Sequence, residues 1–267
     1  MVDVLKRNNV NIIGNGEKTI VLAHGFGCDQ KMWKYITPSL EADYKLVLFD
    51  YVGAGNSDVE AYKTEKYSTL RGYAQDVFDI LDTLKLRDIT FIGHSISSMI
   101  GMIAAIERPD YFKQVLMIGP SACYLNEPET AYIGGFEKSD VVELLDMMEM
   151  NFTGWASYMA PAVMDDTKGP ELVQNIESSF ASTNPRIARE FAEVTFLSDN
   201  RKEVPFMTVP TLIIQCSEDS IVPIAAGEYL HAQMPNSTLQ VLDAKGHYPH
   251  MSMPSETLQI ITDYLDR

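Results

Sequence analysis

The sequence predicts an α/β protein built on a doubly wound, mostly parallel sheet. Short runs rich in Val, Ile and Leu recur along the chain, and each is apolar at nearly every position, which is typical of strands covered on both faces. Helical patterns lie between several of these runs. Alternation of strand and helix favours a parallel sheet with helices on both faces. The expected strands are 19–23, 46–49, 89–92, 115–118, 212–215 and 239–242.

Helical periodicity in the first half of the chain covers residues 73–84 and 99–106. The second of these patterns stops before Pro109, because proline cannot continue a helix. From about residue 123 to 198 the strand pattern is absent and helix-like stretches follow one another. The pair Ser139–Asp140 and Asn184 are suitable helix starts. The four expected helices there cover 141–150, 155–163, 171–180 and 185–197.

We therefore expect one sheet interrupted by a helical insertion. Residues 1–122 form the first part of the core, 123–198 a four-helix cap, and 199–267 the second part of the core. The length of 267 residues suits one large α/β domain of this kind. The cap is expected over the carboxyl edge of the sheet, where ligands of open α/β sheets bind.

The composition of the chain argues against two kinds of binding partner. The formal charge is −16, with 21 Lys and Arg against 37 Asp and Glu, so binding to nucleic acid or to an anionic membrane surface is not expected. The first residues lack the apolar segment of a secretory signal, and no apolar run is long enough to cross a bilayer. Cys28, Cys123 and Cys216 show no metal spacing and are expected as reduced thiols. We expect a cytoplasmic protein.

Ser95 stands where an expected strand meets an expected helix, with Gly93 two residues before it. This pattern is typical of a nucleophile elbow, a turn so sharp that only small neighbours fit beside the serine. Ser97 occupies the position where the commonest form of the motif has glycine. The motif is therefore imperfect and needs support from the rest of the chain.

A serine nucleophile needs a base within hydrogen-bond reach and a third group to orient that base. Asp219 follows the strand at 212–215, and His247 follows the strand at 239–242, directly after Gly246. The order serine, acid, histidine at successive strand ends predicts a catalytic triad of Ser95, Asp219 and His247. Its rivals are Glu218, interpreted as a solvated carboxylate, and His250, which lacks the preceding glycine that lets His247 reach over the sheet edge.

Acyl transfer also needs donors for the charge that develops on the carbonyl oxygen. The run from His24 to Gly27 follows the first apolar strand, and the backbone N–H groups of Phe26 and Ile96 are the expected oxyanion hole. An ordinary turn into a helix near Asp29 is the alternative interpretation. His24 and His94 are expected to brace the two turns by hydrogen bonds.

Cofactors and metals are not expected. Gly53 and Gly55 follow a strand, but neither a complete GxGxxG nor a GxxxxGK[ST] motif is present. Histidines and carboxylates show no metal spacing, and His231 is expected at the surface. Aromatic residues of the insertion are expected to line an apolar pocket above Ser95. They are Tyr124, Phe136, Trp155, Tyr158 and Phe196.

These motifs resemble the α/β-hydrolase superfamily, and within it the group that contains the bacterial energy-stress (sigma-B pathway) regulator hydrolase and the plant karrikin and strigolactone receptors. The resemblance runs nearly end to end and implies the triad, the oxyanion donors and a cap of four helices over an apolar cavity. The strings that carry it are HGFGCDQ (24–30), FDYVGAGNSD (49–58), GHSISSMIG (93–101), CYLNEP (123–128), GGFE (134–137) and GHYPHMS (246–252).

Two functions follow from this resemblance. The first is a serine hydrolase of small apolar esters or butenolide-like lactones. The second is a stress-signalling regulator or small-molecule receptor whose hydrolase site senses or generates a ligand and whose cap binds a protein such as a phosphatase. A haloperoxidase-like enzyme or a C–C bond hydrolase could use the same triad, whereas dehalogenases and epoxide hydrolases usually have aspartate at the elbow.

Overall fold

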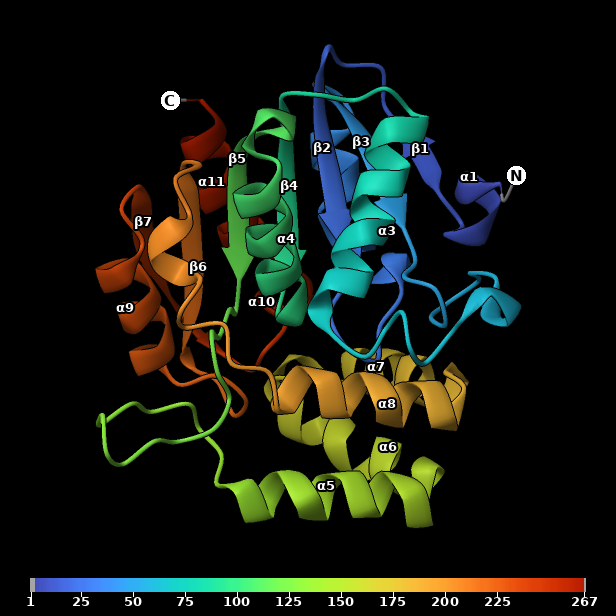
Figure 1. The fold of residues 1–267 in the computed structure, drawn as a ribbon, viewed down its shortest axis with the longest axis vertical. Coiled ribbons are helices and arrows are strands. Elements are labelled where there is room, and N and C mark those ends of the chain that lie inside the picture. Colours follow the sequence, from blue (N-terminus) through green and yellow to red (C-terminus); the bar gives the residue numbers. More distant parts are fainter. Residues whose placement is uncertain (1–2, 267) are drawn as a thin grey trace.

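A seven-stranded sheet runs through the molecule in the computed structural model, which describes residues 3–266 except for the side chain of Asp166 (Figure 1). Neighbouring strands are parallel, apart from β1, which pairs antiparallel with β3. In spatial order the strands are β1 (Asn11–Ile13), β3 (Tyr44–Phe49), β2 (Lys18–Ala23), β4 (Ile89–His94), β5 (Phe112–Ile118), β6 (Thr211–Glu218) and β7 (Ser237–Lys245).

The prediction of a mostly parallel α/β sheet is confirmed, and all six expected strands lie within β2 to β7. Strand β1 was not predicted; it is a three-residue edge strand of which two residues are exposed. Such a strand has no apolar run, because only one of its edges is paired and its side chains lie near solvent. By contrast, every residue of β4 is buried, since β2 and β5 flank it on either side.

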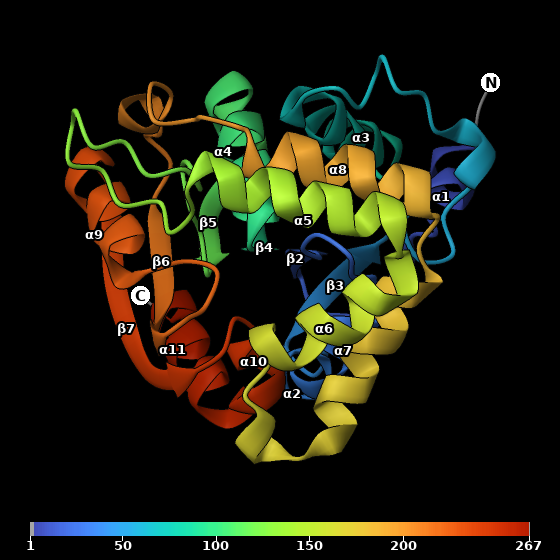
Figure 2. The ribbon, with the colours of Figure 1, turned by 90° about the horizontal axis from the view of Figure 1, so that it is seen from below.

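Helices cover both faces of the sheet (Figure 2). On one face lie α3 (Leu70–Thr83) and α4 (Ile96–Glu107), and on the other lies α11 (Pro254–Leu265), while α9 (Ile224–Gln233) packs against β6 and β7. Shorter helices are α1 (Val4–Arg7), α2 (Thr37–Leu40) and α10 (Pro249–Ser252), with 3₁₀ turns at Gln30–Tyr35, Val59–Ala61, Pro109–Tyr111, Asp166–Lys168 and Val204–Phe206.

Four helices occupy the stretch of chain between β5 and β6: α5 (Lys138–Met150), α6 (Phe152–Val163), α7 (Pro170–Ser182) and α8 (Pro185–Phe196). They lie below the ends to which the strand arrows point, across the carboxyl edge of the sheet (Figures 1 and 2). Asn184 caps α8 as predicted, because its side chain accepts hydrogen bonds from the N–H groups of Arg186 and Ile187. The cap of α5 is Glu137, two residues before Ser139.

No helix among residues 3–266 combines the length and the apolarity that a bilayer crossing requires.

Candidate active site

Ser95 sits in a strained turn between β4 and α4. Its φ is 55° and its ψ is −125°, a backbone conformation that non-glycine residues rarely adopt. A Cβ on Gly93 would lie 2.6 Å from the carbonyl oxygen of Ser97, so only glycine fits at that position. The turn therefore has the geometry of a nucleophile elbow, with Ser95 only 6% exposed.

Ser97 has a structural role that a glycine could not perform. Its Oγ donates a hydrogen bond to the backbone carbonyl of His24 and contacts the Tyr51 hydroxyl at 3.1 Å. The serine thus connects the elbow to the turn that follows β2. Here the departure from the commonest motif adds a contact between the two turns.

Asp219 and His247 form a buried pair. Nδ1 of His247 lies 2.7 Å from Oδ2 of Asp219, and the two side chains are 4% exposed for His247 and 0% for Asp219. Oδ1 of Asp219 accepts the backbone N–H groups of Ile221, at 2.8 Å, and Val222, at 3.1 Å. These bonds fix the carboxylate after β6, so that it orients the imidazole as the third group of a triad does.

The reactive side of the imidazole faces the cavity that contains Ser95. Ser95 and His247 both line this cavity, and Nε2 of His247 is buried without a hydrogen-bond partner among the described residues. Oγ of Ser95 instead lies 3.4 Å from the hydroxyl of Tyr124. Burial raises the pKa of Tyr124, which keeps this hydroxyl neutral. Nε2 of His247 is thus left without a partner at the wall of this cavity.

Glu218 and His250, the alternatives to Asp219 and His247, lie in different surroundings. Glu218 is exposed, as expected of a solvated carboxylate. His250 is fully buried, its ring centroid lies 4.6 Å from that of Trp33, and burial lowers its pKa to about 3. Neither ring nitrogen of His250 has a hydrogen-bond partner among the described residues, so no carboxylate orients this imidazole. His231 is exposed, also as expected.

His94 and His24 both make hydrogen bonds that hold backbone segments around Ser95. His94 bonds a residue far along the chain, whereas His24 bonds its neighbour Gly25 and Tyr51. Nε2 of His94 lies 2.8 Å from the carbonyl oxygen of His247, so the residue before Ser95 holds the backbone of His247. Burial lowers the pKa of His94 well below its usual value, which leaves a neutral ring that donates from Nε2. His24 contacts the carbonyl oxygen of Gly25 and accepts the N–H of Tyr51.

The two expected oxyanion donors lie beside the nucleophile. Ile96 is the first residue of α4, so its N–H has no intrahelical acceptor. Phe26 lines the same cavity as Ser95, in the turn where Gly27 has a φ of 71°. A Cβ on Gly25 would lie 2.5 Å from Nδ1 of His94, which explains why that turn needs glycine.

The cavity at Ser95 is small and mostly apolar. Its volume is about 30 Å³. Of the five aromatic residues expected there, Tyr124, Trp155 and Phe196 line it. The full lining comprises Phe26, Ser95, Tyr124, Leu144, Trp155, Met159, Val163, Phe180, Thr195, Phe196, Ile221, His247 and Tyr248.

The other two expected lining residues were wrong. Tyr158 is 64% exposed, because it lies on the outer side of α6, and Phe136 packs behind the lining, with its ring centroid 5.5 Å from that of Phe196. Met159 and Val163 also line the cavity, although neither was predicted to do so. Their spacing of four residues from one another, continuing from Trp155, is the helical signal that could have found them.

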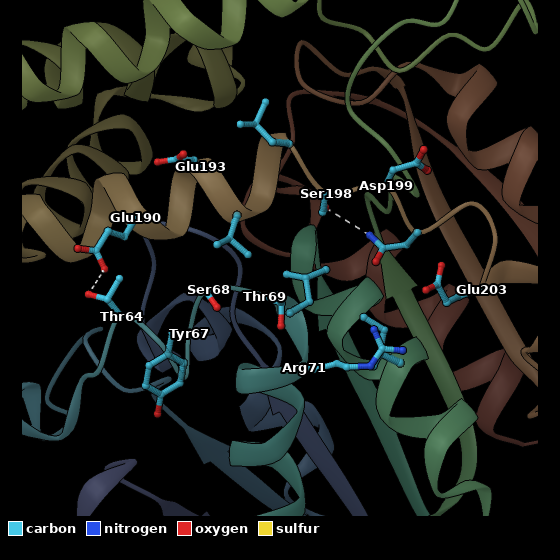
Figure 3. A pocket seen from close by; sticks show the side chains of 15 residues that line it. Thr64, Tyr67, Ser68, Thr69, Arg71, Glu190, Glu193, Ser198, Asp199 and Glu203 are labelled. Carbon is cyan, nitrogen blue, oxygen red and sulfur yellow. Dashed lines mark hydrogen bonds between the residues drawn. The ribbon is translucent and has the colours of Figure 1, made fainter.

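A larger groove of about 520 Å³ lies between α8 and the amino-terminal end of α3 (Figure 3). Its side chains include Thr64, Tyr67, Arg71, Glu190, Glu193 and Glu203. Ser95, Asp219 and His247 are absent from its lining. The larger volume of this groove therefore does not make it the candidate active site. The candidate active site is the smaller cavity, which contains Ser95 and His247.

Within the described residues, no group of three His, Cys, Asp or Glu side chains is placed to hold a metal ion. The three cysteines are free and buried. Burial raises the pKa of Cys28, whose Sγ lies 3.6 Å from the Tyr248 hydroxyl, to about 12, so this thiol stays protonated.

Comparison with known proteins agrees with this fold. The sequence model of the alpha/beta hydrolase fold family matches residues 18–254. The karrikin insensitive 2 receptor CA of Petunia hybrida is 40% identical over 236 residues, covering 88% of this chain and 87% of the relative. A probable esterase of Oryza sativa subsp. japonica is 39% identical over 237 residues, covering 88% of this chain and 87% of the relative.

Among solved structures, a hydrolase from Oleispira antarctica superposes with a TM-score of 0.96 at 43% identity, covering 99% of this chain and 97% of that one. The chain therefore belongs to the α/β hydrolase fold family, within the group that includes the karrikin and strigolactone receptors. It is an enzyme of the hydrolase class.

Proposed function

We propose that the protein is a serine hydrolase that cleaves small, uncharged, apolar esters or lactones through Ser95, His247 and Asp219. The observation that carries the proposal is the buried 2.7 Å contact between His247 and Asp219 at the wall of a cavity that also contains the strained Ser95. A carboxylate, an oriented imidazole and a hydroxyl raised on a sharp turn are the parts that acyl transfer from an ester needs.

In the proposed reaction, Oγ of Ser95 attacks the carbonyl carbon while Nε2 of His247 takes the hydroxyl proton. Asp219 stabilises the imidazolium, and the N–H groups of Phe26 and Ile96 stabilise the oxyanion. His247 then gives its proton to the departing alcohol oxygen as the C–O bond breaks. In the second half, water attacks the acyl-enzyme, His247 takes the water proton, and Oγ of Ser95 leaves and recovers a proton from His247.

The character of the cavity supports the proposed substrate class. Most of its lining is apolar, and no Lys, Arg, Asp or Glu lies among the described residues that line it. A charged acyl group would therefore lose its hydration without a partner. The likeness to a probable esterase and to a 3-oxoadipate enol-lactonase of Acinetobacter baylyi supports esters and lactones.

Turnover of 4-nitrophenyl acetate by Ser95→Ala tests the proposal. Loss of such a nucleophile costs about a millionfold in kcat, so the variant should fall to the background rate. Ser182→Ala is the matched control, because Ser182 is exposed on α7 away from the cavity. A fluorophosphonate probe should label Ser95, as shown by peptide mapping, and should leave Ser95→Ala unlabelled. Full turnover by Ser95→Ala would refute the mechanism.

We further propose that residues 123–198 act as the cap unit of this enzyme, inserted between core segments 1–122 and 199–267, and that the protein works in the cytoplasm. Apart from the residues that take part in the proposed reaction, most of the residues that line the cavity come from the four helices of the insertion.

A second candidate function is signalling, in which the site senses or generates a ligand and the cap binds a regulatory protein such as a phosphatase. The likeness to a karrikin receptor over most of both chains favours it. Affinity capture from a lysate of the source organism, with wild type and Ser95→Ala as baits, separates the two functions. A partner captured by wild type and lost with Ser95→Ala supports signalling through the site, whereas no partner with either bait contradicts it.

A further inference from the structure

Thr195 has a buried hydroxyl that the fold leaves without a partner. The residue lies on α8 and is 1% exposed, and its Oγ1 has no hydrogen-bond partner among the described residues. A threonine in a helix commonly donates to the carbonyl four residues earlier, but the Thr195 hydroxyl does not bond that carbonyl, which belongs to Phe191. The hydroxyl is therefore not used by its own helix.

Thr195 lines the same cavity as Ser95 and His247. Apart from the proposed reacting groups, the lining offers little polarity. The Tyr248 hydroxyl accepts a hydrogen bond from the Cys28 thiol. The Nε1–H of Trp155 can donate a hydrogen bond but cannot accept one. Among the described lining residues outside the reacting groups, Thr195 thus supplies the one hydroxyl that is both unpartnered and able to donate or accept.

An unpartnered buried hydroxyl is costly, because it loses its hydrogen bonds to water and gains none. Valine has nearly the same shape and would fill this position without that cost. A cavity of about 30 Å³ has room for one water molecule, which could satisfy the hydroxyl when no substrate is bound. A substrate that displaces such a water binds well only if it replaces the water's hydrogen bond.

We propose that Thr195 determines specificity by hydrogen bonding a second oxygen of the substrate, so that the preferred substrates are small esters or lactones that carry an ether, carbonyl or hydroxyl oxygen in the acyl part. This inference rests on the proposed function and names its substrate class more narrowly. The carbonyl under attack remains with the oxyanion donors, and the additional oxygen lies toward α8.

Two matched pairs of esters test the inference. 4-Nitrophenyl methoxyacetate is compared with 4-nitrophenyl butanoate, and 4-nitrophenyl 3-methoxypropanoate with 4-nitrophenyl pentanoate. Within each pair an ether oxygen replaces one methylene, and the two pairs place that oxygen at different depths. The ratio of kcat/KM within a pair is measured for wild type, Thr195→Val and Thr195→Ser. Intrinsic reactivity cancels when the ratios of two proteins are compared.

We expect Thr195→Val to lower the ratio of oxygenated to hydrocarbon ester about 3- to 10-fold in at least one pair, as loss of one neutral hydrogen bond predicts. Thr195→Ser, which keeps the hydroxyl, should keep the wild-type ratio within about twofold. Equal ratios in all three proteins for both pairs would overturn the inference. They would leave the proposed function intact, because that function fails only if Ser95→Ala retains turnover. Melting temperatures of both variants establish that they are folded.

Discussion

His94 shows how one residue can control the geometry of two turns. It immediately precedes Ser95, and its ring donates to the backbone carbonyl of His247 over 2.8 Å. Ser95 and His247 follow different strands, β4 and β7, yet this hydrogen bond connects the two turns. In the proposed mechanism His94 is therefore a positioning residue that would affect turnover through His247.

Replacement of His94 separates the hydrogen bond from the volume of the ring. His94→Phe fills the site but removes the donor, so kcat should fall about tenfold to a hundredfold as the base loses its alignment, with a smaller change in KM. His94→Gln can present an amide N–H near the position of Nε2 and should recover a large part of that loss. Steady-state kinetics with 4-nitrophenyl acetate measure both variants, and identical kcat values for the two would contradict the positioning role.

His250 gives the stability of the fold a pH dependence. Burial lowers its pKa from 6.5 to about 3. Between these values the unfolded chain binds a proton that the folded chain does not, so the free energy of unfolding decreases as the pH falls below about 6.5. The contribution of His250 is complete above pH 6.5 and is lost progressively toward pH 3.

His250→Phe should remove this contribution. Relative to its own value at pH 7, the variant should lose less stability at pH 5 than wild type does, by up to about 2 kcal/mol, because one proton is worth about 1.4 kcal/mol per pH unit. Urea denaturation of both proteins at the two pH values measures the difference. The His94 ring lies 4.8 Å from that of His250, but burial is the main cause of its lowered pKa and persists in the variant, so its own contribution should change little. Parallel pH dependences for wild type and variant would show that His250 is not the source.

At the scale of elements, the elbow depends on contacts between the turn before α4 and the turn after β2. Ser97 makes the contact, since its Oγ donates to the carbonyl oxygen of His24. Ser97→Ala should destabilise the fold by about 1–3 kcal/mol, because it leaves a buried carbonyl without this donor. Urea denaturation measures the loss. Ser68→Ala is the control, because the Ser68 hydroxyl bonds the Glu65 carbonyl in an exposed loop. An equal effect of the two substitutions would contradict the role assigned to Ser97.

The elements also show what the sequence could predict. Strands such as β4 are buried on both faces and are therefore apolar throughout, which makes them visible in the sequence. The edge strand β1 has no such pattern. Asp219 and His247 could be predicted because they follow strand ends, where parallel strands bring distant residues together. The prediction that Tyr158 lines the cavity was wrong, because residue type does not tell which side of α6 faces the cavity. The contact of Ser95 with Tyr124 depends on the path of a loop, and no periodic pattern in the sequence encodes that path.

For the whole molecule, the dominant electrostatic property is a formal charge of −16. Like charges repel more strongly in the compact fold than in the extended chain, and salt screens this repulsion. The melting temperature should therefore rise between about 10 mM and about 150 mM NaCl, where the Debye length falls from about 30 Å to about 8 Å. Differential scanning calorimetry measures it, with KCl at the same ionic strength as the control for ion-specific effects. A melting temperature that falls with salt would show that attractive ion pairs outweigh the net charge.

The small volume of the Ser95 cavity limits how a substrate can enter it. About 30 Å³ admits a water molecule but not an ester together with its leaving group, so α5 to α8 must part from the sheet before a substrate can enter. In the proposed mechanism the same helices must move again to release the alcohol. If the proposed mechanism holds, the rate at which these four helices move sets an upper limit on the rate of turnover.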